Sequence, residues 1–124
     1  QQIEKIEYFI TERKKIFEYY KNKFKNCKTI KIFEPLEKTE PVFYRFVIQI
    51  KNKENIDEII KNYKKFGIEV AKPIFLPLDK YYYGKFICRN SKLLYETTLS
   101  LPLYPSLKKK EVSYISKVTT EILK

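Results

Sequence analysis

The sequence predicts an α+β domain with a small, mostly antiparallel sheet of three to four strands packed against helices. The chain has 124 residues, of which 44% are hydrophobic, so it can form one domain with a core of its own. β-Branched and aromatic residues are concentrated in short segments, most clearly in residues 42–50 (VFYRFVIQI). Apolar residues recur at helical spacing elsewhere, and strands segregated from helices are typical of α+β domains.

Residues 1–25 are predicted to form an amphipathic helix. Its apolar stripe, expected to pack against the core, contains Ile3, Ile6, Ile10, Phe17, Tyr20 and Phe24. Arg13 interrupts this stripe, and two interpretations stay open. Its stem extends along the stripe while the guanidinium pairs with a carboxylate, or the guanidinium reaches a ligand.

The middle of the chain alternates strand and helix patterns. Residues 29–33 and 42–50 are predicted strands on either side of a charged loop, and the second is expected to be central. Residues 51–67 are a predicted helix, capped by Asn52 or Asn55 and ended by Gly67. Its expected inner face contains Ile56, Ile59, Ile60 and Tyr63. Residues 68–75 are predicted to form a further strand.

The C-terminal third begins with a loop and ends in helices. Residues 73–89 combine prolines, basic residues and three consecutive tyrosines, and loops of such length are often functional. Residues 91–100 are a predicted helix capped by Ser91. A last helix is expected over residues 110–123, with an inward face of Val112, Ile115, Val118 and Ile122.

The formal net charge of +11 raises the possibility of an acidic partner. Only three of the 26 basic residues are arginines, whereas base readout depends on arginine forks and amide pairs. The lysine excess therefore favours solvated faces over a nucleic-acid partner. A basic module that stacks single-stranded nucleic acid on its tyrosines remains the alternative.

Several residue types that chemistry requires are scarce. The chain has no histidine, which removes the usual zinc ligand sets and the Ser–His and Cys–His nucleophiles. Two glycines cannot form a glycine-rich phosphate loop. Cys27 and Cys88 are expected to be reduced, in a cytoplasmic protein without a membrane span. Because the chain contains no methionine, we expect it to be a piece of a longer protein.

Four ordered segments resemble the DegT/DnrJ/StrS family of sugar aminotransferases. Residues 97–123 (TTLSLPLYPSLKKKEVSYISKVTTEIL) are similar to its C-terminal signature, a short helix, an "lSLPlyP.L" turn and a last helix. Residues 12–24 (ERKKIFEYYKNKF), 44–50 (YRFVIQI) and 66–82 (FGIEVAKPIFLPLDKYY) agree in order and spacing. The resemblance covers nearly the whole chain. It implies a structural role for Leu101–Leu107, in which two prolines fix the backbone between two helices.

The family implies a function for a longer protein. Its members are fold type I pyridoxal phosphate (PLP) enzymes that transfer an amino group, usually from glutamate, to a nucleotide-linked keto sugar. Their large N-terminal domain holds the cofactor lysine, and a second subunit completes a homodimer. Residues 1–124 resemble only the C-terminal small domain, which closes one side of the substrate cleft. The resemblance assigns no catalytic or cofactor-binding residue here, so the chain alone is expected to be inactive.

The resemblance also implies candidate substrate-binding residues. They are Lys72, Phe75, Asp79, Lys80 and Tyr81 in the loop, with Arg45 in the central strand. Asp79 stands where the family usually has histidine, and a carboxylate would repel a substrate diphosphate. Three explanations stay open: a different substrate, compensation by Lys72 and Lys80, or a catalytically dead relative kept for regulation or assembly.

Overall fold

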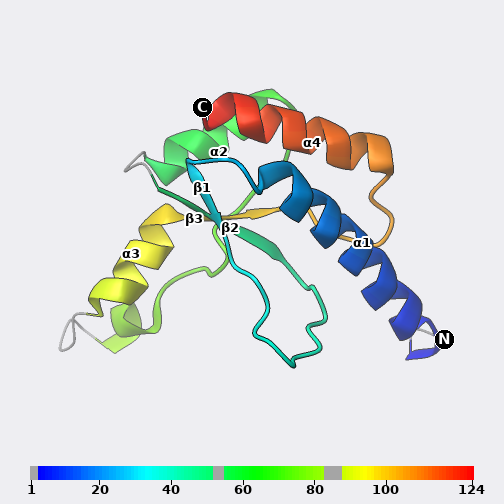
Figure 1. The fold of residues 1–124 in the computed structure, drawn as a ribbon. Helices are drawn as coiled ribbons and strands as arrows, with labels where there is room; N and C mark the ends of the chain where they lie inside the picture. Colours follow the sequence, from blue (N-terminus) through cyan, green and yellow to red (C-terminus); the bar gives the residue numbers. More distant parts are fainter. Residues whose placement is uncertain (1–2, 52–54, 83–87) are drawn as a thin grey trace.

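The sheet of this protein is covered by helices on one face, while loops and a short helix extend from the other (Figure 1). The computed structural model describes residues 3–51, 55–82 and 88–124. The elements in chain order are η1 (Ile3–Lys5), α1 (Ile6–Phe24), β1 (Ile30–Ile32), β2 (Phe46–Ile50), α2 (Ile56–Lys65), η2 (Leu78–Tyr82), α3 (Arg89–Thr97), β3 (Thr98–Leu101) and α4 (Lys109–Ile122).

The sheet has three antiparallel strands in the order β1-β2-β3, which confirms the predicted α+β class. Ile48 of β2 pairs with Ile32 on one side and Leu99 on the other, so β2 is central as predicted. β2 begins only at Phe46, later than expected. Phe43 has a φ of 48°, a left-handed conformation that interrupts an extended strand.

The core lies between the sheet and the layer of α1, α2 and α4 (Figure 1). Phe46 of β2 is fully buried, and its ring centroid lies 5.1 Å from that of Phe17 and 4.9 Å from that of Tyr20. Alternate side chains of a strand point to opposite faces, so Phe46, Ile48 and Ile50 form the helix-facing side of β2.

The first half of α1 lies beyond the core, and the predicted stripe is wrong there. Phe17, Tyr20 and Phe24 are buried as expected, but Ile3 is 84% exposed and Ile6 is 52% exposed. Figure 1 shows this end of α1 projecting past the sheet. Periodicity identified the apolar face, and Ile10 is half-buried, but the side chains at the very start of the helix are exposed.

The ends of α2 follow the predicted signals. The side chain of Asn55 accepts a hydrogen bond from the backbone N–H of Asp57 at 3.0 Å, and Gly67 follows the helix with a φ of 70°. Asn52, the other predicted cap, lies outside the described residues. Ile56, Ile59 and Tyr63 are buried, and Ile60 is partly buried.

The third strand is not where the sequence placed it. Residues 68–75 form only an isolated bridge, between Ala71 and Ser100, whereas residues 98–101 form β3 instead of the end of a helix. Pro73 lacks the N–H that a longer ladder would need. α3 begins at Arg89 with Cys88 as its N-cap, so the predicted Ser91 cap is also wrong.

The turn between β3 and α4 is part of the core, which confirms its predicted packing role. Leu101, Leu103 and Leu107 are buried. The Tyr20 hydroxyl donates to the carbonyl oxygen of Pro102 at 3.0 Å and so joins α1 to the turn. Val112, Ile115 and Val118 of α4 are buried as predicted, and Ile122 is partly buried.

Candidate functional site

The predicted loop residues lie on one arm of the molecule, made of residues 72–82 and α3. After the Ala71–Ser100 bridge the chain leaves the sheet and reaches η2, which carries Asp79, Lys80 and Tyr81. Figure 1 shows η2 beside α3. The Tyr95 hydroxyl of α3 donates to the carbonyl oxygen of Phe75 at 3.1 Å, which joins the two segments.

Large apolar side chains of this arm are exposed. Phe75 is 91% exposed, Leu78 is 76% exposed and Tyr81 is 56% exposed. We call Phe75, Leu78 and Tyr81 the apolar ridge. Aromatic faces of this kind can stack on a ring, and the neighbouring exposed Lys80 can pair with a phosphate.

Asp79 has an unusual environment for a carboxylate. The residue is half-buried, and its Oδ1 atom is buried with no hydrogen-bond partner among the described residues. A buried acceptor without a partner is unfavourable, and an incoming hydrogen-bond donor would satisfy it. A phosphate would not, because both groups are acceptors carrying negative charge.

Lys72 is held by contacts within the protein. Its Nζ atom lies 3.0 Å from Oδ1 of Asp57 in the first turn of α2. The same atom lies 4.5 Å from the ring centroid of Tyr95. The sequence did not indicate Asp57 or Tyr95 as parts of the site, because neither stands in a motif.

Arg45 lies on a different segment from the other candidates. It is exposed, directly precedes β2, and its guanidinium carbon lies 5.1 Å from the Tyr44 ring centroid. No ion pair or hydrogen bond of the described residues joins it to residues 72–82. The loop before β2 and the η2–α3 arm do extend from the same side of the sheet (Figure 1).

Polar groups occupy the sheet face on this side. Gln49 of β2 donates from Nε2 to Oγ1 of Thr97 at 3.2 Å, and Thr98 pairs with Gln49 in the ladder. Ser100 pairs with Val47 on the same face. In the sequence, Thr98 and Ser100 alternate with leucines, and this alternation is typical of a strand with one polar face. It lies in a segment predicted to be helical, and the strand was therefore missed.

Arg13 is half-buried on α1, and its Nε atom has no hydrogen-bond partner among the described residues. The described salt bridges do not include it, so the carboxylate partner that one interpretation requires is not seen in this part of the chain. Its contact with a ligand stays a prediction.

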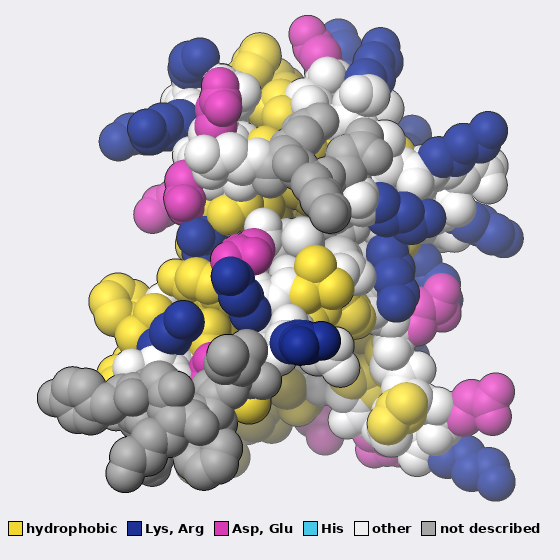
Figure 2. Space-filling model, turned by 90° about the vertical axis from the view of Figure 1, so that its left-hand side faces the viewer, with side chains coloured by type: hydrophobic (Ala, Val, Ile, Leu, Met, Phe, Trp, Pro, Cys, Tyr) yellow, Lys and Arg dark blue, Asp and Glu magenta, His cyan; other side chains and the backbone are white. Residues whose placement is uncertain are grey.

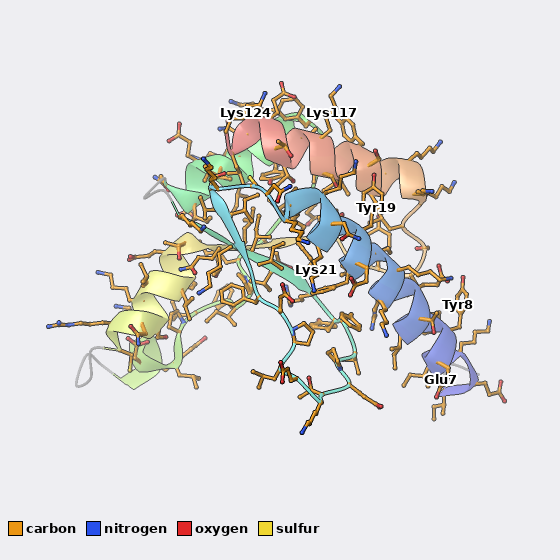
Figure 3. The ribbon with its side chains drawn as sticks, in the orientation of Figure 1. Glu7, Tyr8, Tyr19, Lys21, Lys117 and Lys124 are labelled. Carbon is orange, nitrogen blue, oxygen red and sulfur yellow. The ribbon has the colours of Figure 1, made fainter. Side chains whose placement is uncertain are left out.

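Lysines are dispersed over the surface. Figure 2 shows Lys and Arg side chains spread over one face with acidic side chains between them. A groove of about 430 Å³ between α1 and α4 is lined by Lys23, Lys117 and Lys124 together with Glu121. Figure 3 shows Lys117 and Lys124 at the outer side of α4. Lys23 lies in the last turn of α1, where a cation stabilises the partial negative charge of the helix C-terminus.

The described residues contain neither a metal-ligand cluster nor a membrane-spanning helix. No group of three or more His, Cys, Asp or Glu side chains is placed to hold a metal ion in that part of the chain. None of the helices in residues 3–51, 55–82 and 88–124 is long and apolar enough to cross a membrane.

Residues 1–119 match the profile of the DegT/DnrJ/EryC1/StrS aminotransferase family. The chain belongs to this family. No curated protein matches the sequence, but many solved structures share the fold. The aminotransferase TlmJ from Streptoalloteichus hindustanus superimposes with a TM-score of 0.89 at 18% identity, covering 98% of this chain and 34% of TlmJ.

Two further solved structures share this fold. Helicobacter pylori PseC, an aminotransferase involved in the biosynthesis of pseudoaminic acid, has a TM-score of 0.87 at 18% identity over 98% of this chain and 34% of PseC. The putative sugar aminotransferase Spr1654 from Streptococcus pneumoniae, in its PMP form, has a TM-score of 0.85 at 22% identity over 98% and 32%. This DegT-family chain therefore spans about a third of the length of these structures.

DegT-family aminotransferases depend on PLP, and the described residues do not fit its covalent attachment. A Schiff-base lysine works from a desolvated pocket. No lysine of the described residues is buried, and the half-buried Lys72 is paired with Asp57. The described residues therefore offer no lysine suited to covalent attachment of PLP.

Proposed function

We propose that this chain is the C-terminal domain of a PLP-dependent aminotransferase that acts on a nucleotide-linked keto sugar. The amino donor is glutamate, and the product serves amino-sugar or cell-surface polysaccharide biosynthesis in the cytoplasm. The observation that carries the proposal is the family match over residues 1–119. The putative sugar aminotransferase Spr1654 among the structural neighbours supports a sugar as the substrate.

The missing partner in this proposal is an N-terminal large domain of the same polypeptide, which binds PLP and forms a homodimer. The chain covers 34% of the TlmJ structure, and its described residues offer no buried lysine for the cofactor. Ile3 of η1 and Ile6 at the start of α1, together with Leu78 of the arm, supply exposed apolar surface for such a neighbour. The isolated chain is therefore inactive.

The substrate side of the proposal uses the arm and Arg45. Phe75 and Tyr81 offer ring faces to a nucleobase or sugar, and Lys80 and Arg45 pair with phosphate oxygens. The buried Oδ1 of Asp79 accepts a hydrogen bond from a hydroxyl or amino group of the substrate. Asp79 then binds a hydrogen-bond donor of the substrate and does not contact the diphosphate.

The decisive experiment combines the reading frame upstream of the Gln1 codon with an activity assay. We expect an in-frame large domain with a cofactor lysine. The purified chain, the purified large domain with PLP, and their mixture are then assayed with glutamate and a panel of nucleotide-linked keto sugars. Transamination only where both parts are present supports the proposal.

Two results would contradict this assignment. Transamination by the 124-residue chain alone would show that the chemistry resides in it. A start codon immediately before Gln1 would favour a free-standing binding or regulatory domain. For that case, an oligonucleotide titration at low salt tests the nucleic-acid alternative, since phosphate contacts make such binding strongly salt-dependent.

A further inference from the structure

We infer that Lys72 is a positioning residue, which fixes residues 73–81 against α2 and α3 instead of contacting the substrate. Lys72, Asp57 and Tyr95 together are called the latch. The role of the latch in substrate binding rests on the proposed function of the arm. That the latch holds residues 73–81 in place is argued from the contacts of the described residues alone.

The first contact of the latch joins the arm to α2. The ammonium of Lys72 lies 3.0 Å from Oδ1 of Asp57, and the Lys72 side chain is only 19% exposed. Asp57 is itself fixed, because its N–H donates to the Asn55 side chain at 3.0 Å. The Asp57 side chain is 66% exposed, so salt screens this ion pair in part, and the pair holds the loop together with the contacts that Tyr95 makes.

The second contact lies within the arm and joins residues 72–75 to α3. The Lys72 ammonium lies 4.5 Å from the Tyr95 ring centroid, within the range of a cation–π interaction. The Tyr95 hydroxyl donates to the Phe75 carbonyl oxygen at 3.1 Å. Tyr95 thus contacts the loop at two residues, Lys72 through its ring face and Phe75 through its hydroxyl.

Between these contacts and η2 the chain has little freedom. Pro73 and Pro77 each fix their φ, and the Lys80 N–H donates to the Pro77 carbonyl oxygen at 3.0 Å. Fixing Lys72 and the Phe75 carbonyl therefore determines where the apolar ridge and Asp79 lie. The Lys72 charge is shared with Asp57, which leaves Lys80 and Arg45 for an anionic substrate group.

The test compares backbone order parameters from ¹⁵N NMR relaxation in four forms of the chain: wild type, Lys72→Met, Lys72→Arg and Lys92→Met. Methionine keeps the stem but removes the charge, whereas arginine can pair with Asp57 and stack on Tyr95. Lys92 is the matched control, because it forms an exposed pair with Glu96 at 3.8 Å on the same arm.

We expect residues 74–81 to be rigid in wild type, with order parameters near 0.85, and to fall below about 0.6 in Lys72→Met. Lys72→Arg restores the rigid values, and Lys92→Met leaves them unchanged. A second pair of variants changes Tyr95. Tyr95→Phe keeps the ring contact, so the order parameters of residues 74–81 should fall only in part. Tyr95→Leu should lower them as much as Lys72→Met does.

Unchanged order parameters in Lys72→Met would overturn the latch, as would equal loosening by Lys92→Met. If Lys72→Met also lowers the order parameters of β2 and α4, Asp57→Asn is measured in its place, because it keeps the Lys72 side chain. Residues 74–81 that stay rigid in Asp57→Asn then overturn the proposal. These readouts need no transamination. A failed latch is therefore distinguishable from a failed assignment as an aminotransferase domain.

Discussion

The phenolic oxygen of Tyr63 lies 3.0 Å from Oγ1 of Thr119, and both residues are fully buried. This hydrogen bond joins α2 to α4 inside the helical layer. It satisfies two polar groups that would otherwise lie without partners in the core. Sequence periodicity placed Tyr63 on the inner face of its helix, but only the packing of α4 supplied its partner.

Tyr63→Phe is expected to lower the free energy of unfolding by about 1 kcal/mol, because the Thr119 hydroxyl loses its buried partner. Urea denaturation followed by circular dichroism measures this change. Tyr114→Phe is the control, since the Tyr114 hydroxyl donates to Phe66 at 3.1 Å but the residue is 48% exposed. We expect the control to change stability by less than about 0.5 kcal/mol. Equal effects in both variants would contradict the role of burial.

Stability should fall above about pH 10, where tyrosine ordinarily titrates. Burial raises the pKa of Tyr20 and of Tyr63 above that value. Above pH 10 the unfolded chain therefore binds fewer protons than the folded chain, and the free energy of unfolding decreases as pH rises. Below pH 10 this contribution is fully present.

The expected slope is at most about 1.4 kcal/mol per pH unit for each buried tyrosine. Urea denaturation at a series of pH values from 8 to 11 measures it. Tyr63→Phe should have a shallower slope than wild type, because one of the two groups is removed. A slope that does not change in this variant would show that other groups, such as the lysines, account for the alkaline loss.

Gly67→Ala should cost about 1 kcal/mol of stability, because Gly67 has a φ of 70°, which is unfavourable for a residue with a Cβ. A Cβ there would meet no atom within 4 Å, so the cost is conformational and not steric crowding by neighbours. Gly67→Asn is expected to lose less, since asparagine tolerates this region better. Thermal and urea unfolding of both variants test the order. An alanine variant as stable as wild type would refute the explanation.

The apolar ridge should cause the isolated chain to self-associate. Phe75 is 91% exposed and Leu78 is 76% exposed, and burying one such side chain contributes about 1.5–3 kcal/mol. Replacing either by serine should weaken association about tenfold or more, as measured by sedimentation velocity at several concentrations. Tyr104→Ser is the control, because Tyr104 is 47% exposed in the turn before α4. A strictly monomeric wild-type chain would contradict this prediction.

Local signals predicted much of the fold because their causes lie within a few neighbouring residues. The Asn55 cap, the stop at Gly67 and the central position of residues 46–50 all depend on nearby backbone chemistry or on a strong apolar strand pattern. Residues 68–75 and 98–101 both contain strand-compatible patterns. Residues 98–101 pair with β2, and residues 68–75 make only a bridge to Ser100, because the choice of the pairing segment depends on the whole chain.

The candidate site was predictable only in part. The sequence indicated an aromatic, basic segment that contains Phe75, Asp79 and Tyr81, and the structure presents two of these side chains at the surface. It gave no sign that Lys72 would be paired with Asp57, which lies fifteen residues earlier, or with the Tyr95 ring. Spacing along the chain carries no information about such contacts.

By itself, then, the sequence determined the α+β class, the four main helices in outline, the central strand and the resemblance to the aminotransferase family. The tertiary structure decided which segment completes the sheet, which half of α1 is buried and which lysine is held inside the arm. The physical reason is that backbone propensity and periodicity act over a few residues. Burial and ion pairing depend instead on what distant segments bring to the same place.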